Sequence, residues 1–186
     1  MLVSYLRSKG IKVALTKEPT HDLIGSIIHK ALYSLGRPLV KNKQANLRAL
    51  QLLFVADRAM HLYNYIMPKE KQNYVVISDR YLLSTIIYGI ASGINKRWLI
   101  ELNKYFPDPD LTILIDVRPE RAVQRLNKRD VTTEYFENLP FIRKTKRIYL
   151  QMRSFHKNCY VVDGDPDKKH VAEQIRRIVD SKLKRR

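Results

Sequence analysis

Two charged residues and a tyrosine directly follow a short apolar run that is typical of a buried strand. The run Tyr74-Val-Val-Ile-Ser78 leads into Asp79-Arg80-Tyr81. Ligands in open α/β sheets bind beyond the carboxyl ends of the strands, so Asp79 and Arg80 lie where a binding site for a charged ligand is expected. The alternative is a strand-end ion pair that only holds a loop.

A second chemical pattern lies in a helix that we expect from about Lys43 to Met67. Phe54 and Arg58 are four residues apart, so they share one face of that helix. An aromatic ring there can stack on a base while the guanidinium binds a phosphate, because its forked donors match phosphate geometry. The alternative is a core phenylalanine beside a surface arginine.

Asp57 and His61 form another pair four residues apart in the same helix. Two candidate ligands are too few for a zinc site, so the sequence favours a hydrogen bond on the helix surface. Glu18 is a further candidate site residue, because Ile11–Thr16 is typical of a strand and Pro19 prevents its continuation as a central one.

The composition sets limits on the class of protein. The 186 residues carry a formal net charge of +17, which indicates an anionic partner, either a nucleotide or a nucleic acid, or else a lysine-rich solvated surface. The single cysteine, Cys159, excludes an internal disulfide framework and is typical of a reducing compartment. With no apolar run of membrane-spanning length, we expect a soluble cytoplasmic protein of one domain.

Apolar runs alternate with helical patterns along the chain. Strands are predicted at residues 11–16, 74–79, 111–117 and 160–163, and helices at residues 2–8, 23–35, 43–67, 95–105 and 167–184, with others through Ser84 and through Phe141 to Phe155. Alternation of this kind predicts an α/β fold with a mainly parallel sheet.

Four segments together resemble the thymidylate kinase family in order and spacing, over nearly the whole chain. They are Thr16-Lys-Glu-Pro19 with Gly25; Leu52-Leu-Phe-Val-Ala-Asp-Arg58; Ser78-Asp-Arg-Tyr81 with Ser84, Thr85 and Tyr88; and Pro109-Asp-Leu-Thr-Ile-Leu-Ile-Asp116 with Pro119-Glu120. Archaeal members are the most similar. The resemblance implies a three-layer, P-loop-kinase-like α/β fold that transfers a phosphoryl group from ATP to dTMP with Mg²⁺, and a homodimer that pairs through the long helix.

The resemblance also implies roles for single residues on the acceptor side. Phe54 would stack on thymine, and Arg58 and Arg80 would hold the acceptor phosphate. Asp79 would act near the magnesium ion and the acceptor oxygens, with Glu18 beside the sugar and phosphate. The deoxyribose and base pocket would be lined by Tyr81, Ser84 and Tyr88.

On the donor side, the resemblance places Arg129 against the adenine of ATP and makes residues 130–147 a lid over the phosphates. Lys144, Lys146 and Arg147 are the candidates for the lid's phosphate contacts. Phosphoryl transfer depends mainly on positioning and on positive charge around the transferred group, which agrees with a basic lid.

The sequence departs from the family at the phosphate-binding loop, because it contains no G-x-x-x-x-G-K-[ST] motif. We expect about 20 residues, a strand and that loop, to precede Met1 in the natural protein, and we expect the donor site of the chain as given to be impaired without them. The family's sheet has this strand at its centre, so its absence would leave unpaired backbone in the remaining four strands.

Two other classes of protein stay open. A deoxyribonucleoside kinase shares the architecture and the Glu-Pro sequence, but usually carries Glu-Arg-Ser where this chain has Asp79-Arg80-Tyr81. A basic nucleic-acid-binding protein should interleave aromatic residues with its basic clusters. The clusters at residues 143–147 and 182–186 contain none, which disfavours nucleic acid as a partner.

Overall fold

The computed structural model describes residues 1–33, 39–127, 138–155 and 158–183. Its backbone contacts divide the chain into two compact units. One unit runs from Ile11 to Pro107, and the other combines Met1–Gly10 with most of the chain from Asp108 onward. The expectations of a single domain and of a lid at residues 130–147 remain predictions, and residues 130–137 lie outside the described part.

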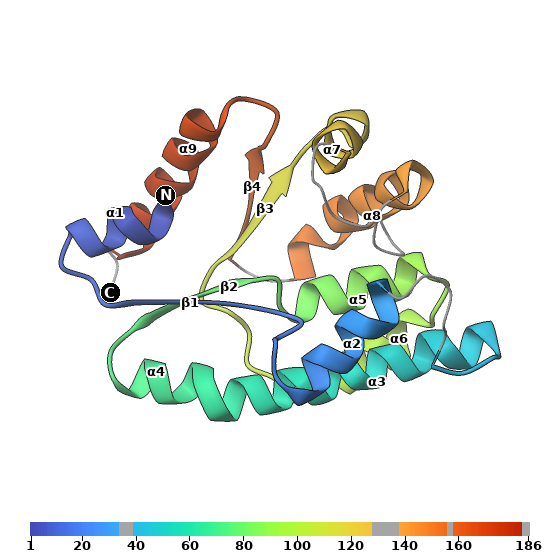
Figure 1. Cartoon of the computed structure of the whole chain (residues 1–186). Helices are drawn as coiled ribbons and strands as arrows, with labels where there is room; N and C mark the ends of the chain where they lie inside the picture. The colour runs from blue at the N-terminus through green and yellow to red at the C-terminus, as the bar shows by residue number, and fades with distance from the viewer. Residues whose placement is uncertain (34–38, 128–137, 156–157, 184–186) are drawn as a thin grey trace. The chain divides into compact units, whose positions relative to one another are not determined.

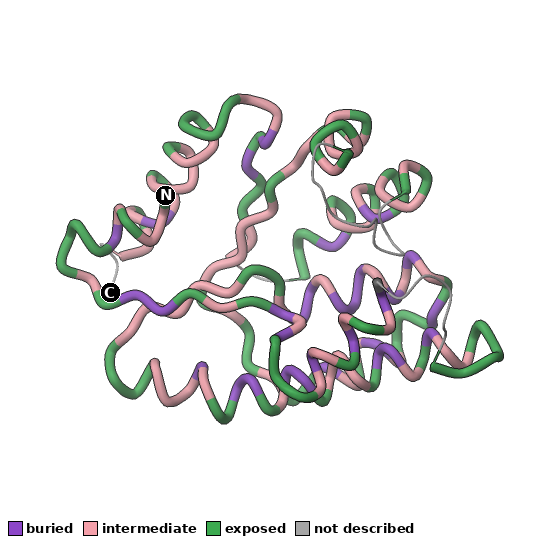
Figure 2. Tube along the Cα trace, in the orientation of Figure 1, coloured by how far each residue is buried: buried purple, intermediate pink, exposed green. Residues whose placement is uncertain are grey.

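The Ile11–Pro107 unit contains two parallel strands and the helices packed around them (Figure 1). In chain order its elements are β1 (Val13–Lys17), α2 (Leu23–Tyr33), α3 (Lys43–His61), a π-helical turn (Leu62–Ile66), α4 (Met67–Lys71), β2 (Val75–Asp79), α5 (Leu82–Ala91) and α6 (Lys96–Asn103). Its core is built from buried aliphatic side chains of α2, α3, α5 and α6, among them Ile28, Leu50, Ile86, Ile87 and Leu99 (Figure 2).

The second unit repeats the pattern of two parallel strands with helices. Its elements are α1 (Leu2–Ser8), β3 (Thr112–Asp116), α7 (Pro119–Leu126), α8 (Leu139–Met152) with a 3₁₀ turn (Arg153–Phe155), β4 (Cys159–Asp163) and α9 (Lys168–Leu183). Helix α1 is joined to α9 by Tyr5 and Lys9, which both bond the Asp180 carboxylate at 2.5 and 2.8 Å.

The strands pair in parallel, as the sequence predicted, but in two separate pairs. β1 pairs with β2 from Val13 opposite Val75 to Lys17 opposite Asp79, and β3 pairs with β4. Within the described residues each strand therefore has only one neighbour. The expectation that the run at residues 74–78 is a buried strand is wrong, because all five of its residues are only half-buried.

The long helix continues further than the sequence predicted. Instead of ending at Met67 before Pro68, it passes through the π-helical turn and runs on as α4 to Lys71. Pro68 lies in the first turn of α4, where the backbone N–H that proline lacks is least needed. The π-helical turn at Leu62–Ile66 begins directly after His61, and such turns are frequent at functional sites.

A close approach of backbone fixes the loop between β1 and α2. A Cβ atom at Gly25 would lie 2.1 Å from the carbonyl oxygen of Thr20, so only glycine fits there. Helix α2 can therefore begin in close contact with Thr20, a few residues after the end of β1. None of the helices in the described ranges combines the length and the apolar character needed to cross a membrane.

Candidate functional site

The end of β1 is tied to α3 by a buried ion pair. Arg58 is 1% exposed, and its Nε and Nη2 donate to Oε2 of Glu18 at 2.9 and 2.7 Å. The other carboxylate oxygen of Glu18 lies 3.2 Å from Nδ1 of His61. Both oxygens of Glu18 are thus engaged by α3, and the carboxylate is held in one orientation.

The same helix binds the residues on either side of Glu18. Thr16 Oγ1 lies 2.6 Å from Nε2 of His61, and the Asp57 carboxylate accepts from the backbone N and the hydroxyl of Thr20 at 2.9 and 2.6 Å. Thr16 near the end of β1, and Glu18 and Thr20 in the bend that follows it, all bond α3. We call this set, with Asp57, Arg58 and His61, the strand-end clamp.

The clamp corrects the interpretation of Asp57 and His61. The sequence favoured a hydrogen bond between them on the helix surface, whereas the two side chains are 2% and 3% exposed and bond different residues of the β1 end. The available signal was that Asp57, Arg58 and His61 lie among apolar residues in the second half of the helix. Such residues are buried only when partners satisfy them.

Arg58 is held by three further residues. Its Nη2 donates to Oγ1 of Thr85 at 2.6 Å, its Nη1 donates to Oδ1 of Asn103 at 2.5 Å, and its guanidinium lies 5.1 Å from the centre of the Tyr81 ring. Sequence reasoning missed Asn103. The signal for it was its spacing of four residues from Leu99, which places an amide on the buried face of α6.

The end of β2 lies beside the end of β1. The backbone N of Glu18 donates to the carbonyl of Asp79 at 3.0 Å, as the parallel pairing predicts. Arg80 has φ +70, in the left-handed region that a non-glycine residue adopts at a cost of about 1–2 kcal/mol. Strain of this kind is common at functional sites. Both Asp79 and Arg80 are exposed.

The structure joins some of the predicted acceptor residues in two groups. Arg58 contacts Glu18 and the Tyr81 ring, and the Arg80 guanidinium lies 5.1 Å from the centre of the Tyr88 ring. Phe54 is half-buried one turn before Arg58 on α3. A cavity of about 290 Å³ elsewhere in this unit is lined by Arg48, Ile94, Asn95 and Trp98, so it contains none of these residues.

Three of the four predicted donor residues lie on one helix. Arg129 lies outside the described residues, whereas Lys144, Lys146 and Arg147 all belong to α8. Lys146 pairs with Asp116 at 2.7 Å, at the carboxyl end of β3. A hydrogen bond from Arg143 to Glu120 lowers the pKa of the Glu120 carboxyl, so α8 is also linked to the start of α7.

Metal ligands are sparse in the described residues, where no group of three or more histidine, cysteine, aspartate or glutamate side chains could hold a metal ion. A single exposed carboxylate at a strand end, Asp79, is nevertheless compatible with Mg²⁺, which is often bound through one or two carboxylates and the phosphates of a substrate.

The buried ion pair predicts strong coupling between its two members. Glu18→Gln should destabilise the protein by about 3–5 kcal/mol, because it leaves the Arg58 charge buried without its counter-ion. The double variant Glu18→Gln/Arg58→Gln should lose clearly less than the sum of the two single variants, as measured by urea unfolding.

The control for this cycle is the exposed pair Arg143–Glu120, where Glu120→Gln should leave the unfolding midpoint nearly unchanged. Additive losses for Glu18 and Arg58 would show that the two side chains do not form a coupled pair.

The chain is similar to known proteins over nearly its whole length. A family model described as thymidylate kinase matches residues 1–175. The chain is 32% identical over 187 residues to a probable thymidylate kinase of Thermococcus onnurineus, covering 100% of this chain and 91% of that protein. It is 34% identical to a thymidylate kinase of Caldicellulosiruptor saccharolyticus, covering 98% of this chain and 88% of that one. The chain therefore belongs to the thymidylate kinase family.

Proposed function

We propose that the protein transfers the γ-phosphoryl group of ATP to dTMP, giving dTDP and ADP. The observation that carries this proposal is the match to thymidylate kinases over nearly the whole chain. Asp79 and Arg80 also support it, because both are exposed at the end of β2, beside the strand-end clamp, where a charged acceptor could bind. A cytoplasmic enzyme is also part of the proposal, on the basis of the single cysteine.

The contacts of Arg58 favour a division of roles between the two arginines. Four hydrogen bonds already engage the Arg58 guanidinium, which has five N–H donors in total. We therefore propose that the exposed Arg80 is the main ligand of the acceptor phosphate, and that Arg58 is a fixed side chain at the edge of the pocket. Glu18 holds Arg58 in place. The base stacks on Phe54.

Tyr81, Ser84 and Tyr88 line the remainder of the proposed acceptor pocket. Tyr88 also supports Arg80, because the Arg80 guanidinium lies over its ring. Asp79 would supply one oxygen ligand to Mg²⁺, which neutralises phosphate charge when bound. On the donor side, Arg129 would contact the adenine, and Lys144, Lys146 or Arg147 would bring positive charge to the phosphates of ATP.

In this scheme the residues of the chain act by positioning and by electrostatics. The transferred group passes through a transition state whose charge is spread over its oxygens, so a fixed cation beside the attacking phosphate lowers the barrier. Arg80 is suited to that role because the backbone at residue 80 is held in a defined, strained conformation. The clamp prevents the neighbouring strand end from moving away.

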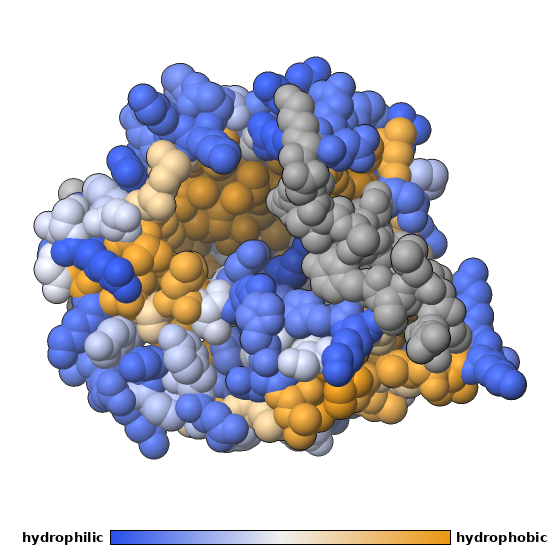
Figure 3. All heavy atoms as spheres, viewed as in Figure 1, coloured by the Kyte–Doolittle hydropathy of each residue, from blue (hydrophilic) through white to orange (hydrophobic). Residues whose placement is uncertain are grey.

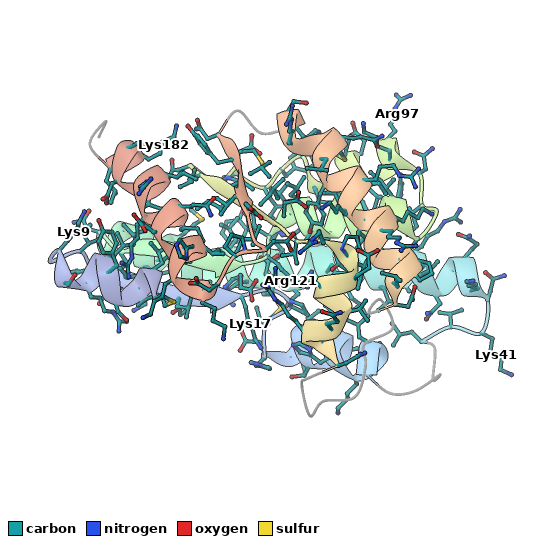
Figure 4. All side chains as sticks on the ribbon, turned by 90° about the horizontal axis from the view of Figure 1, so that it is seen from above. Lys9, Lys17, Lys41, Arg97, Arg121 and Lys182 are labelled. Atoms are coloured by element: carbon teal, nitrogen blue, oxygen red, sulfur yellow. The ribbon has the colours of Figure 1, made fainter. Side chains whose placement is uncertain are left out.

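The alternatives are less well supported. The family match favours a monophosphate acceptor over a nucleoside. The basic side chains labelled in Figure 4 come from separate segments of the chain. Lys9 is paired with Asp180, and Lys182 donates to Asn158. These pairings favour a charged solvated surface over a nucleic-acid site.

Phe54→Ala tests the base-stacking role. It should weaken dTMP binding by about 1–3 kcal/mol, the usual contribution of stacking on an aromatic ring. Isothermal titration calorimetry with dTMP and with thymidine measures this loss. Tyr105→Ala, which removes an 82% exposed ring, is the control and should bind dTMP normally. Tighter binding of thymidine than of dTMP would favour a nucleoside kinase instead.

Arg80→Ala tests the catalytic role. It should lower kcat more than it raises the KM for dTMP if the guanidinium binds charge that develops in the transition state. Arg80→Lys should restore only part of the rate, because an ammonium group lacks the planar fork. A raised KM with an unchanged kcat would reduce Arg80 to a ground-state contact.

We propose in addition that the protein is a homodimer that pairs through α3. An apolar stripe of Leu52, Ala56, Met60 and Tyr63 follows the exposed face of α3 and its continuation, and Leu52 and Tyr63 are 51% and 66% exposed. Figure 3 shows apolar residues gathered along the lower edge of the view, where α3 lies. Exposed apolar stripes of this kind often mark protein interfaces.

Met60→Glu should convert the dimer into a monomer, because it places a charge inside the proposed apolar interface. Sedimentation velocity at micromolar concentration measures the change in mass. Tyr105→Glu, on an exposed residue outside the stripe, is the matched control and should remain dimeric. A wild-type protein that sediments as a monomer would exclude the proposal.

A further inference from the structure

A cavity in the Ile11–Pro107 unit is lined by none of the proposed acceptor residues. Its volume is about 290 Å³, and its lining consists of Arg48 near the start of α3, Ile94 and Asn95 between α5 and α6, and Trp98 in the first turn of α6. Small-molecule sites usually occupy about 300–1,000 Å³, so this volume is close to the lower end of that range. The cavity therefore has room for one small ligand.

The turn between α5 and α6 fixes one side of this cavity. Gly93 follows α5 with φ +87, a left-handed conformation that glycine adopts at little cost. The backbone N of Ile94 then donates to the carbonyl of Gly89 at 3.0 Å, and the Ile94 side chain is buried. Asn95 caps α6, because its Oδ1 accepts from the backbone N of Trp98 at 3.1 Å. Trp98 is thus carried on a helix whose start is well defined.

Arg48 supplies the cavity with a positive charge. The residue is exposed, and in the part of the chain that the structure describes no carboxylate forms an ion pair with it. The cavity is lined from two stretches without acidic residues, since neither residues 23–56 nor residues 80–100 contain aspartate or glutamate. Lys96 and Arg97, in the first turn of α6, add further positive charge. A cleft whose charges are of one sign raises the local concentration of anions.

The lining combines a flat aromatic residue with a guanidinium. Trp98 is half-buried, so part of this residue is accessible to a ligand. Any base can stack on an aromatic ring, and the fork of an arginine matches the oxygens of a phosphate group. The two side chains are therefore complementary to a ligand that carries both a base and a phosphate. Arg48 is the one cation among the lining residues, which matches a single phosphate group.

We propose that this cavity is a second nucleotide site, which takes a nucleoside monophosphate with its base on Trp98 and its phosphate on Arg48. The site is separate from the proposed acceptor site, because none of its lining residues is among those assigned to dTMP. The inference goes beyond the proposed function and does not depend on it.

Trp98 is the only tryptophan in the sequence, so intrinsic tryptophan fluorescence reports on this cavity. The probe is AMP, and adenosine and inorganic phosphate represent its two parts. AMP should quench the fluorescence in a saturable manner, because its base stacks on the indole ring. Adenosine and phosphate should each bind at least about tenfold more weakly than AMP, since each lacks one of the two contacts.

Arg48→Gln tests the phosphate contact. It should raise the Kd for AMP at least about tenfold and leave the Kd for adenosine unchanged, because the guanidinium binds only the phosphate. The melting temperature should stay nearly the same, since Arg48 is exposed. Arg97→Gln is the charge-matched control: it removes an exposed arginine that does not line the cavity, and it should bind AMP as the wild-type protein does.

Saturating dTMP and the Phe54→Ala variant separate this site from the acceptor site, and neither should change the Kd for AMP. A signal that dTMP abolishes or that Phe54→Ala weakens would belong to the acceptor site and would overturn the proposal. Fluorescence that AMP leaves unchanged would overturn it as well, and so would equal AMP affinities of Arg48→Gln and Arg97→Gln. A wild-type protein that binds AMP in this way but does not bind dTMP would contradict only the proposed function.

Discussion

The buried ion pair between Arg58 and Glu18 is the interaction on which the rest of this unit depends. A guanidinium that is 1% exposed must be neutralised and hydrogen-bonded: Glu18 neutralises it, and Thr85 and Asn103 accept further hydrogen bonds from it. These three residues belong to the end of β1, to α5 and to α6. One side chain of α3 therefore sets the spacing of three elements around the proposed pocket.

The strand-end clamp extends this constraint along β1. His61 bonds Thr16, two residues before Glu18, and Asp57 bonds Thr20, two residues after it. Gly25 lets α2 begin in close contact with Thr20. A backbone hydrogen bond from Glu18 to Asp79 links these residues to the end of β2, and Arg80, the next residue, adopts its strained conformation there. Groups fixed in this way need little rearrangement when a ligand binds, which is the condition for strong electrostatic stabilisation.

The sequence predicted the elements well and their contacts less well. Periodicity located nearly every strand and helix, because it depends on which face is buried. Periodicity could not show that the long helix continues beyond Pro68, because the continuation depends on a local π-helical turn. Nor could spacing show whether Arg58 is exposed for a phosphate or buried, because that depends on Asn103, 45 residues away. The pairing of strands in two separate pairs depends likewise on non-local contacts.

The central claim is that Arg58 is fixed before the ligand binds and stays fixed afterwards. A crystal structure of the protein with dTMP tests this most directly. In that complex, Arg58 should keep its hydrogen bonds to Glu18, Thr85 and Asn103 while Arg80 contacts the phosphate. An Arg58 side chain that leaves Glu18 and binds the phosphate would contradict it.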